Sequence, residues 1–169
     1  MYFLDHQAIP PEIICIQETW IYQETLPIIT GYSSTHTYRI NKKGGGSAIY
    51  IKNEIQYVTL NAVKFDDIEI EVAGIKCLVN GKDHITILSV YIAPSQVLRS
   101  DHLNKLLVDD NLIIMGDLNA KSQLWGSPIA DTRGKLIENF VEENNLVCRN
   151  NGEGTRLNVN GSVSHLDII

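Results

Sequence analysis

The apolar residues of this chain fall mostly in short runs, a pattern that predicts many strands and few helices. Runs of about four to eight apolar or β-branched residues, bounded by turn residues, are typical of strands. Apolar residues recur at helical spacing in only two segments. We therefore expect strands at 13–16, 32–38, 47–52, 55–60, 68–79, 84–92, 112–115, 146–148 and 163–169, and helices at 100–109 and 131–145.

Turn residues indicate how these strands are joined. The dipeptides Asn80-Gly81 and Asn160-Gly161 favour tight hairpin turns, and Pro94 ends the strand before it. Five or six strands follow one another with little helix between them, which favours an α+β fold built from stacked antiparallel sheets. A glycine-rich turn at 42–46 could suggest a phosphate-binding loop, but it lacks the GKS/T ending and a strand follows it. We interpret it as a connection between strands.

The most informative stretch is NLIIMGDLNAKSQLWGSP, residues 111–128. Four apolar residues precede Gly116, and the polar residues Asp117 and Asn119 follow it. The pattern predicts a buried strand with two polar side chains at its end. In a pleated continuation Asp117 and Asn119 point the same way, with Leu118 turned to the core. The pair could line a catalytic pocket, or it could only shape the turn by bonding to nearby backbone groups. The stretch alone leaves both readings open.

Other polar residues stand at the ends of apolar strands in the same way as Asp117. They are Glu18, Tyr91, Ser164 and Asp167. Hydrolysis of a phosphodiester needs a carboxylate that holds Mg²⁺ or Mn²⁺, a base that activates water, and neutral donors for the charge on the phosphoryl oxygens. Glu18 suits the first role and Asp117 the second. Asn119 and Tyr91 suit the third, and Asp167 could complete the acidic cluster or hold a histidine.

Bulk properties favour one globular domain over residues 1–169. Apolar residues make up 44% of the 169-residue chain and charged residues 20%. No apolar run approaches the ~20 residues of a membrane helix, and the N-terminus has no signal-peptide pattern, so we expect a nuclear or cytoplasmic protein without a membrane partner. The three separated cysteines predict buried free thiols. A net charge of −6 argues against non-specific nucleic-acid binding over a broad basic surface, so a nucleic-acid role must rest on the site.

The polar strand ends resemble the endonuclease/exonuclease/phosphatase superfamily, and within it the endonuclease domains of jockey-like non-LTR retrotransposons. The shared motifs are QET around Glu18, GGGSAIYI, VYIAP around Tyr91, IIMGDLNA around Asp117, WGS, DTRG and SHLD around Asp167. The resemblance implies a four-layer αββα sandwich of the DNase I type that nicks DNA to prime reverse transcription, with a reverse transcriptase encoded downstream. It implies Glu18 as the metal ligand, Tyr91 and Asn119 as phosphate contacts, Asp117 as the water-activating acid, and Ser164 and Asp167 as a supporting pair.

The chain also departs from this family. The family's first strand, which carries an asparagine, and its last, which carries serine, aspartate and histidine, have no counterpart, so we expect a domain incomplete at both termini with little or no turnover. The tripeptide Ser100-Asp101-His102 contains the same residue types as the family's last strand, but it precedes the GDLN motif, and we assign it to the start of a helix. We interpret His165 as a neutral strand residue. Two alternatives remain: a non-catalytic remnant or domesticated binding module, and a phosphatase of the same superfamily.

Overall fold

Two β-sheets form the centre of the molecule. The computed structural model describes residues 9–21, 26–39, 43–61, 63–79, 81–157, 161 and 163–169. One sheet is antiparallel and has the order β1 (Ile13–Gln17), β3 (Ser47–Lys52), β2 (Tyr32–Thr37). The other has the order β10 (Asp167–Ile168), β7 (Leu112–Asp117), β6 (Asp83–Ile92), β5 (Ile70–Val79), β4 (Tyr57–Thr59). Its strands pair antiparallel except for β6 and β7, which run parallel.

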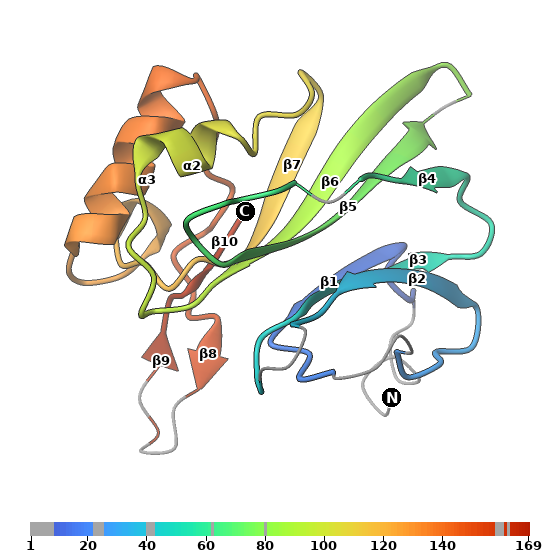
Figure 1. Ribbon diagram of the computed structural model, residues 1–169, viewed down its shortest axis with the longest axis horizontal. Helices are drawn as coiled ribbons and strands as arrows, with labels where there is room; N and C mark the ends of the chain where they lie inside the picture. The colour runs from blue at the N-terminus through green and yellow to red at the C-terminus, as the bar shows by residue number, and fades with distance from the viewer. Residues whose placement is uncertain are drawn as a thin grey trace.

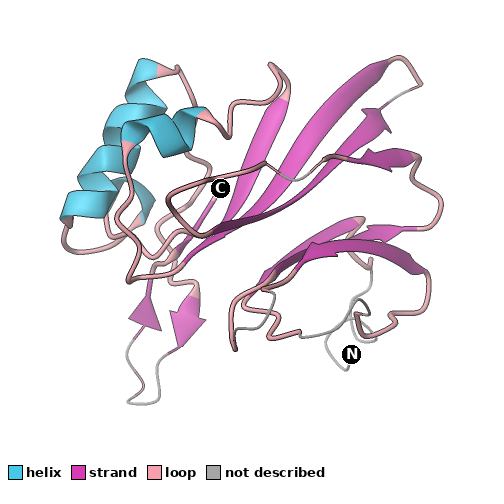
Figure 2. Ribbon diagram, in the orientation of Figure 1, coloured by secondary structure: helices cyan, strands magenta, loops and turns pink. Residues whose placement is uncertain are grey.

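The five-stranded sheet is covered on one face by helices and on the other by the three-stranded sheet (Figures 1 and 2). The helices are α2 (Ser100–Asn104), the short 3-10 helix η1 (Gln123–Trp125) and α3 (Thr132–Glu143). Alternate residues of β5 and β6, such as Val72, Leu88 and Val90, pack beneath them in one apolar core. Residues on the opposite face of these two strands, including Ile75 and Ile87, pack against β3 in a second apolar core. The period-two pattern of these strands therefore supplies two apolar faces.

The sheets and helices belong to the sandwich class that the sequence predicts. The expected stacking of two mostly antiparallel sheets is confirmed, and so is the hairpin between β5 and β6, where Val79 pairs with Asp83. Asn80 and Asn160 of the two predicted turns lie outside the described residues, as does the segment 1–8. In the part of the chain that the structure describes, helices cover one outer face of the sandwich, and none is long and apolar enough to cross a membrane.

Two predicted strands differ in the structure. The segment 163–169 divides into β9 (Val163–Ser164), which pairs with β8 (Arg156–Leu157), and β10, which pairs with β7. The division arises because the Thr155 hydroxyl accepts the backbone N–H groups of Leu166 and Asp167 and bends the chain between the two strands. The predicted strand at 146–148 is wrong: these residues follow α3 without regular secondary structure.

The first predicted helix is shorter than expected. It ends at Asn104, and the next residues form tight turns in which the N–H groups of Leu106 and Leu107 bond to carbonyls three residues back. Leu103 and Leu106 are still buried, so the apolar pattern was correct although the regular helix stops early. The N-cap is Arg99, not Ser100 or Asp101. The second helix matches its prediction, with the Asp131 side chain accepting the N–H of Gly134 at the N-terminus.

Gly116 permits the close contact between β6 and β7. A Cβ atom at this position would lie 1.9 Å from the carbonyl oxygen of Val90. A side chain here would force the two strands apart, directly before Asp117. The glycine of the GDLN motif is therefore required by packing.

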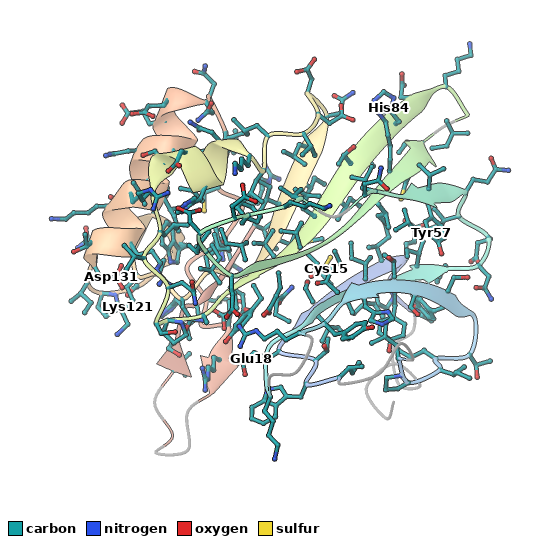
Figure 3. The ribbon with its side chains drawn as sticks, viewed as in Figure 1. Cys15, Glu18, Tyr57, His84, Lys121 and Asp131 are labelled. Atoms are coloured by element: carbon teal, nitrogen blue, oxygen red, sulfur yellow. The ribbon has the colours of Figure 1, made fainter. Side chains whose placement is uncertain are left out.

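The three cysteines are free thiols, as predicted. Cys77 is buried, and Cys15 lies between the two sheets (Figure 3). Burial raises the pKa of the Cys15 thiol to about 12, so the thiolate does not form at neutral pH.

Candidate active site

Four polar residues stand in one row across the five-stranded sheet. Glu71 on β5 pairs with Tyr91 on β6, Tyr91 pairs with Asp117 on β7, and Asp117 pairs with Asp167 on β10. Side chains of directly paired residues lie on the same face of a sheet. The register thus places a phenol and three carboxyl groups side by side, at the end of the sheet where β6 and β7 terminate.

Glu18 reaches this row from the other sheet. It follows β1 directly, and its Oε1 atom accepts a hydrogen bond from the Tyr91 hydroxyl at 2.7 Å. Figure 3 shows Glu18 at the edge of the sandwich, opposite the end where His84 lies. Its φ of 50° is in the left-handed region, which a residue with a side chain occupies at an energetic cost of about 1–3 kcal/mol. The fold therefore maintains an unfavourable backbone conformation at the position that aims this carboxylate at Tyr91.

The glycine-rich turn holds the Glu18 segment in place. The N–H groups of Thr19 and Trp20 bond to the carbonyls of Gly46 and Gly45, at 3.4 and 2.9 Å. The turn also contacts the row, because the N–H of Gly46 donates to Oε2 of Glu71 at 2.8 Å. A Cβ atom at Gly45 would lie 2.6 Å from the Glu71 carboxylate. This turn is a connection between strands, as the sequence suggested, and it also supports the site.

Asp117 forms the turn bond that one reading of the GDLN stretch predicts, and it also lies in the acidic row. Oδ1 of Asp117 accepts the backbone N–H of Asn119 at 2.9 Å, which is the local turn bond expected of an aspartate. Asn119 has a φ of 48°, and its side-chain amide donates to the carbonyl of Ile92 at 3.1 Å. Leu118 is buried, as predicted. The turn chemistry therefore fixes the orientation of the two side chains that border the acidic row.

The site concentrates negative charge. Burial raises the pKa of Asp117 above its ordinary value, and the nearby carboxylates of Asp167 and Glu18 raise it further, while Arg156 acts in the opposite direction. The pKa of Tyr91 is also raised, first by burial and then by its bond to Glu18. Tyr91 is consequently a neutral hydrogen-bond donor at physiological pH. Asp117 is a carboxylate with increased proton affinity, which is a property of general bases.

The donor set fits a hard divalent ion bound through few protein ligands. The carboxylates of Glu18, Asp117 and Asp167 repel one another, and a cation among them would relieve this repulsion. Mg²⁺ commonly binds through one or two carboxylates and retains several waters. Among the described residues, no group of three or more His, Cys, Asp or Glu side chains is placed to hold a metal ion together. An open site with oxygen ligands suits Mg²⁺ or Mn²⁺ better than a structural metal.

The remaining residues singled out from the sequence lie at the margin of the site or elsewhere. Ser164 lies in the β8–β9 hairpin, which projects from the molecule (Figure 1), and its buried hydroxyl has no hydrogen-bond partner among the described residues. His165 Nε2 lies 3.1 Å from the carbonyl oxygen of Gly152. His102 is fully buried in α2 and contacts Asp67, which agrees with a structural role for the Ser100-Asp101-His102 tripeptide.

Sequence reasoning missed three residues that organise the site. Arg39 forms an ion pair with Glu71, and its guanidinium carbon lies 5.9 Å from the centre of the Tyr91 ring. Arg133 donates to backbone carbonyls in both loops that follow β6 and β7, among them Leu118 and Ala93. Glu71 was detectable as a charge within an apolar strand, because such a residue usually has a buried partner. No local pattern identifies Arg39 as that partner.

Comparison with known proteins agrees with this geometry. The family model described as endonuclease-reverse transcriptase matches residues 85–169, which include Tyr91, Asp117, Asn119 and Asp167. The RNA-directed DNA polymerase from the mobile element jockey of Drosophila melanogaster is 25% identical over 130 residues, or 75% of this chain. The jockey polymerase of Drosophila funebris is 24% identical over 157 residues, or 90% of the chain. The chain spans only 14% and 17% of these two relatives.

A solved structure confirms the fold. The endonuclease domain of TRAS1, a telomere-specific non-LTR retrotransposon, superposes with a TM-score of 0.71 over 93% of this chain and 70% of that one, at 22% identity. The resemblance to retrotransposon endonuclease domains, inferred from short motifs, is thereby confirmed. Together with the family match, it supports a nuclease function in general.

Proposed function

Because the chain belongs to the endonuclease-reverse transcriptase family, we propose that its acidic site is that of a divalent-metal-dependent DNA endonuclease. The observation that carries this proposal is the convergence of Glu18, Asp117 and Asp167 from three distant segments onto one sheet end, around the neutral donor Tyr91. In an acidic cluster with a purely structural role, we would expect each carboxylate to form an ion pair with a lysine or arginine side chain. Here the carboxylates of Asp167 and Glu18 add to the effect of burial in raising the pKa of Asp117, and Arg156 acts against them.

In this proposal Glu18 is the principal ligand of Mg²⁺ or Mn²⁺. It is exposed, it has a carboxylate oxygen bonded to Tyr91, and its backbone is fixed by the glycine turn. The ion supplies charge neutralisation at the scissile phosphate when it is bound. Tyr91 has a single O–H, which donates to this carboxylate. A cation on the Glu18 carboxylate would free that O–H to donate to a phosphoryl oxygen.

Asp117 accepts the proton of the attacking water, and Asn119 donates to the phosphate. A raised pKa brings the Asp117 carboxylate closer to the range in which proton acceptance is efficient near neutral pH. The bond from the Asn119 backbone N–H to Oδ1 of Asp117 holds the Asp117 carboxylate against the turn that carries Asn119. Asp167 increases the proton affinity of Asp117 by its charge, and Ser164 lies on the neighbouring hairpin as a candidate substrate contact.

The biological setting follows from the relatives, and it is part of the proposal. Enzymes of mobile elements that carry an RNA-directed DNA polymerase need a DNA end from which to copy. We propose that this chain nicks target DNA to provide that end, and that a reverse transcriptase domain encoded downstream uses it. The chain corresponds to less than a fifth of the jockey polymerases, so the activity of such a longer protein is itself a proposal.

Nicking of supercoiled plasmid tests the proposal. We expect Mg²⁺-dependent conversion to the open circle under enzyme excess, where slow turnover is also measured. Asp117→Ala should reduce the rate about 10²- to 10⁴-fold, as is usual for loss of a general base. Asp83→Ala is the matched control, because Asp83 is an exposed aspartate at the opposite end of β6 from Tyr91. Equal nicking by the Asp117 variant and the wild type would reject the proposed role.

A further inference from the structure

Trp20 is a large aromatic residue exposed directly beside the acidic site. Its side chain is 57% exposed, although it lies only two residues from Glu18. The chain contains two tryptophans, and the other, Trp125, is fully buried. An exposed tryptophan at a functional site needs an explanation, since burial of this side chain is among the most stabilising contacts available to a folding chain.

The structure holds Trp20 in a fixed position. Its backbone N–H bonds to the carbonyl of Gly45, and its φ of 54° turns the chain sharply at this point. The indole Nε1–H points toward Oε2 of Glu18 at 3.4 Å. One edge of the ring lies against Gly44, where an added Cβ would be 3.9 Å from the indole carbons. These contacts anchor the polar edge of the indole while much of the ring remains open to solvent.

A flat aromatic surface held in this way suits a nucleobase. Base–aromatic stacking is tolerant of sequence because every base has a π-face, and a pre-positioned ring loses little freedom on binding. Glu18 connects Trp20 to the position of the scissile phosphate, so a base stacked on the indole belongs to a nucleotide close to that phosphate. Lys43 is exposed beside Gly44 and can approach the adjoining backbone phosphates.

We propose that Trp20 stacks on a base of the DNA strand next to the phosphate held at Glu18 and Tyr91. This inference rests on the proposed function, which supplies the DNA strand. The inference assigns Trp20 to the binding of a nucleotide base, whereas the acidic residues act on the phosphodiester bond. In the alternative, the indole only stabilises the contact between the glycine turn and the Glu18 segment. The experiment below distinguishes this structural role from base stacking.

Tryptophan fluorescence tests the stacking contact directly. The measurement uses the Asp117→Asn background with Mg²⁺, so that the DNA stays intact, and a single-stranded 12-mer of thymidylate as the probe. We expect the probe to quench the emission of Trp20, while that of the buried Trp125 is unchanged. Trp20→Leu should bind the probe about fivefold or more weakly, and Trp20→Phe should retain most of the affinity because it keeps a π-face. Emission from Trp125 shows that each variant is folded.

An abasic 12-mer is the matched control, because it keeps the phosphates and lacks the bases. Wild type and Trp20→Leu should bind it equally. The proposal is overturned if Trp20→Leu binds the thymidylate probe as tightly as the wild type, or if its affinity for both probes falls by the same factor. Quenching by the probe without plasmid nicking by the wild type would support the base contact and reject the nuclease function. Nicking without quenching would support the nuclease function and reject the base contact.

Discussion

Glu18 and Asn119 show how single residues are strained to form this site. Both have positive φ values, at 50° and 48°, although neither is glycine. Such conformations persist only where surrounding contacts determine them, and they cluster at functional positions. Here the contacts are identified: the glycine turn fixes the segment after Glu18, and Asp117 with Ile92 fixes Asn119. The backbone conformations of these two residues, which flank the proposed phosphate position, therefore lower the stability of the folded state.

Asp117→Asn should make the protein more stable at neutral pH while it abolishes nicking. The folded state raises the pKa of Asp117 by burial and by repulsion from Asp167 and Glu18, so ionisation of this group opposes folding. Asparagine removes that charge and can still accept the N–H of Asn119. We expect the thermal midpoint to rise by about 2 °C or more at pH 7.

The stabilisation by Asp117→Asn should depend on pH in a defined direction. Below the ordinary aspartate pKa of 3.8, the carboxyl is protonated in both the folded and the unfolded chain, so variant and wild type should melt together. As pH rises through the folded-state pKa, the wild type loses stability relative to the variant. Melting curves from pH 3 to pH 7 that show a constant difference, or the opposite trend, would contradict this account.

At the scale of elements, the site depends on how closely strands and loops approach one another. The sequence predicts β3, β5, β6, β7 and α3 well, because strong apolar periodicity and clear turn or cap residues agree there. It predicts β10 and α2 poorly. Their boundaries depend on distant hydrogen bonds, such as those that the backbone N–H groups of Leu166 and Asp167 donate to the Thr155 hydroxyl. Short elements held by tertiary contacts have little local signal.

Gly116→Ala should destabilise the protein strongly. The added Cβ would overlap the Val90 carbonyl, and backbone atoms of a central strand cannot move aside. We expect a loss of about 3 kcal/mol or more in urea unfolding. Gly74→Ala is the control on β5, which lies on the other side of β6 from β7. Its new methyl would meet the Cδ2 atom of Leu88 and the side chain of Leu60 instead of backbone atoms, and these side chains can adjust. Comparable losses for the two variants would refute the packing argument.

Arg133 should couple α3 to the two loops of the site. Its guanidinium donates to carbonyls after β6 and after β7, and no apolar residue can replace these bonds. Arg133→Met should therefore lower the free energy of unfolding by about 2 kcal/mol, since several carbonyls lose their partner. Arg149→Met, a substitution at an exposed arginine after α3, should change it by less than about 0.5 kcal/mol. Similar effects of both substitutions would contradict the coupling.

At the scale of the whole molecule, charge limits how this chain can bind DNA. The net charge of −6 argues against a broad cationic surface, so we propose that DNA binding depends on local cations near the site, such as Arg156 and Lys43, and on the proposed metal ion. The positions of Glu18, Tyr91, Asp117 and Asp167 at the ends of apolar strands grouped them as candidate site residues, and the resemblance then implied a role for each. Glu71 was detectable as a charge within an apolar strand, but its partner Arg39 was not, because an ion pair between residues distant in sequence has no local signature.

The affinity for DNA should depend only moderately on salt. Two or three phosphate contacts predict a decrease of about 10- to 40-fold between 50 and 200 mM KCl, compared with about 10³- to 10⁵-fold for proteins that make six to ten. Fluorescence anisotropy with the Asp117→Asn variant, labelled DNA and constant Mg²⁺ measures this dependence. A decrease of about 10³-fold or more would indicate an extensive cationic surface that the charge distribution does not support.

The central claim is that carboxylates from separate strands act as one site for a hard divalent ion. Titration with Mn²⁺, followed by the electron paramagnetic resonance signal of the free ion, tests it without requiring turnover. We predict one Mn²⁺ per chain, an affinity reduced about tenfold or more in Glu18→Gln, and no change in Asp83→Asn. Equal Mn²⁺ binding by the wild type and Glu18→Gln would contradict the account.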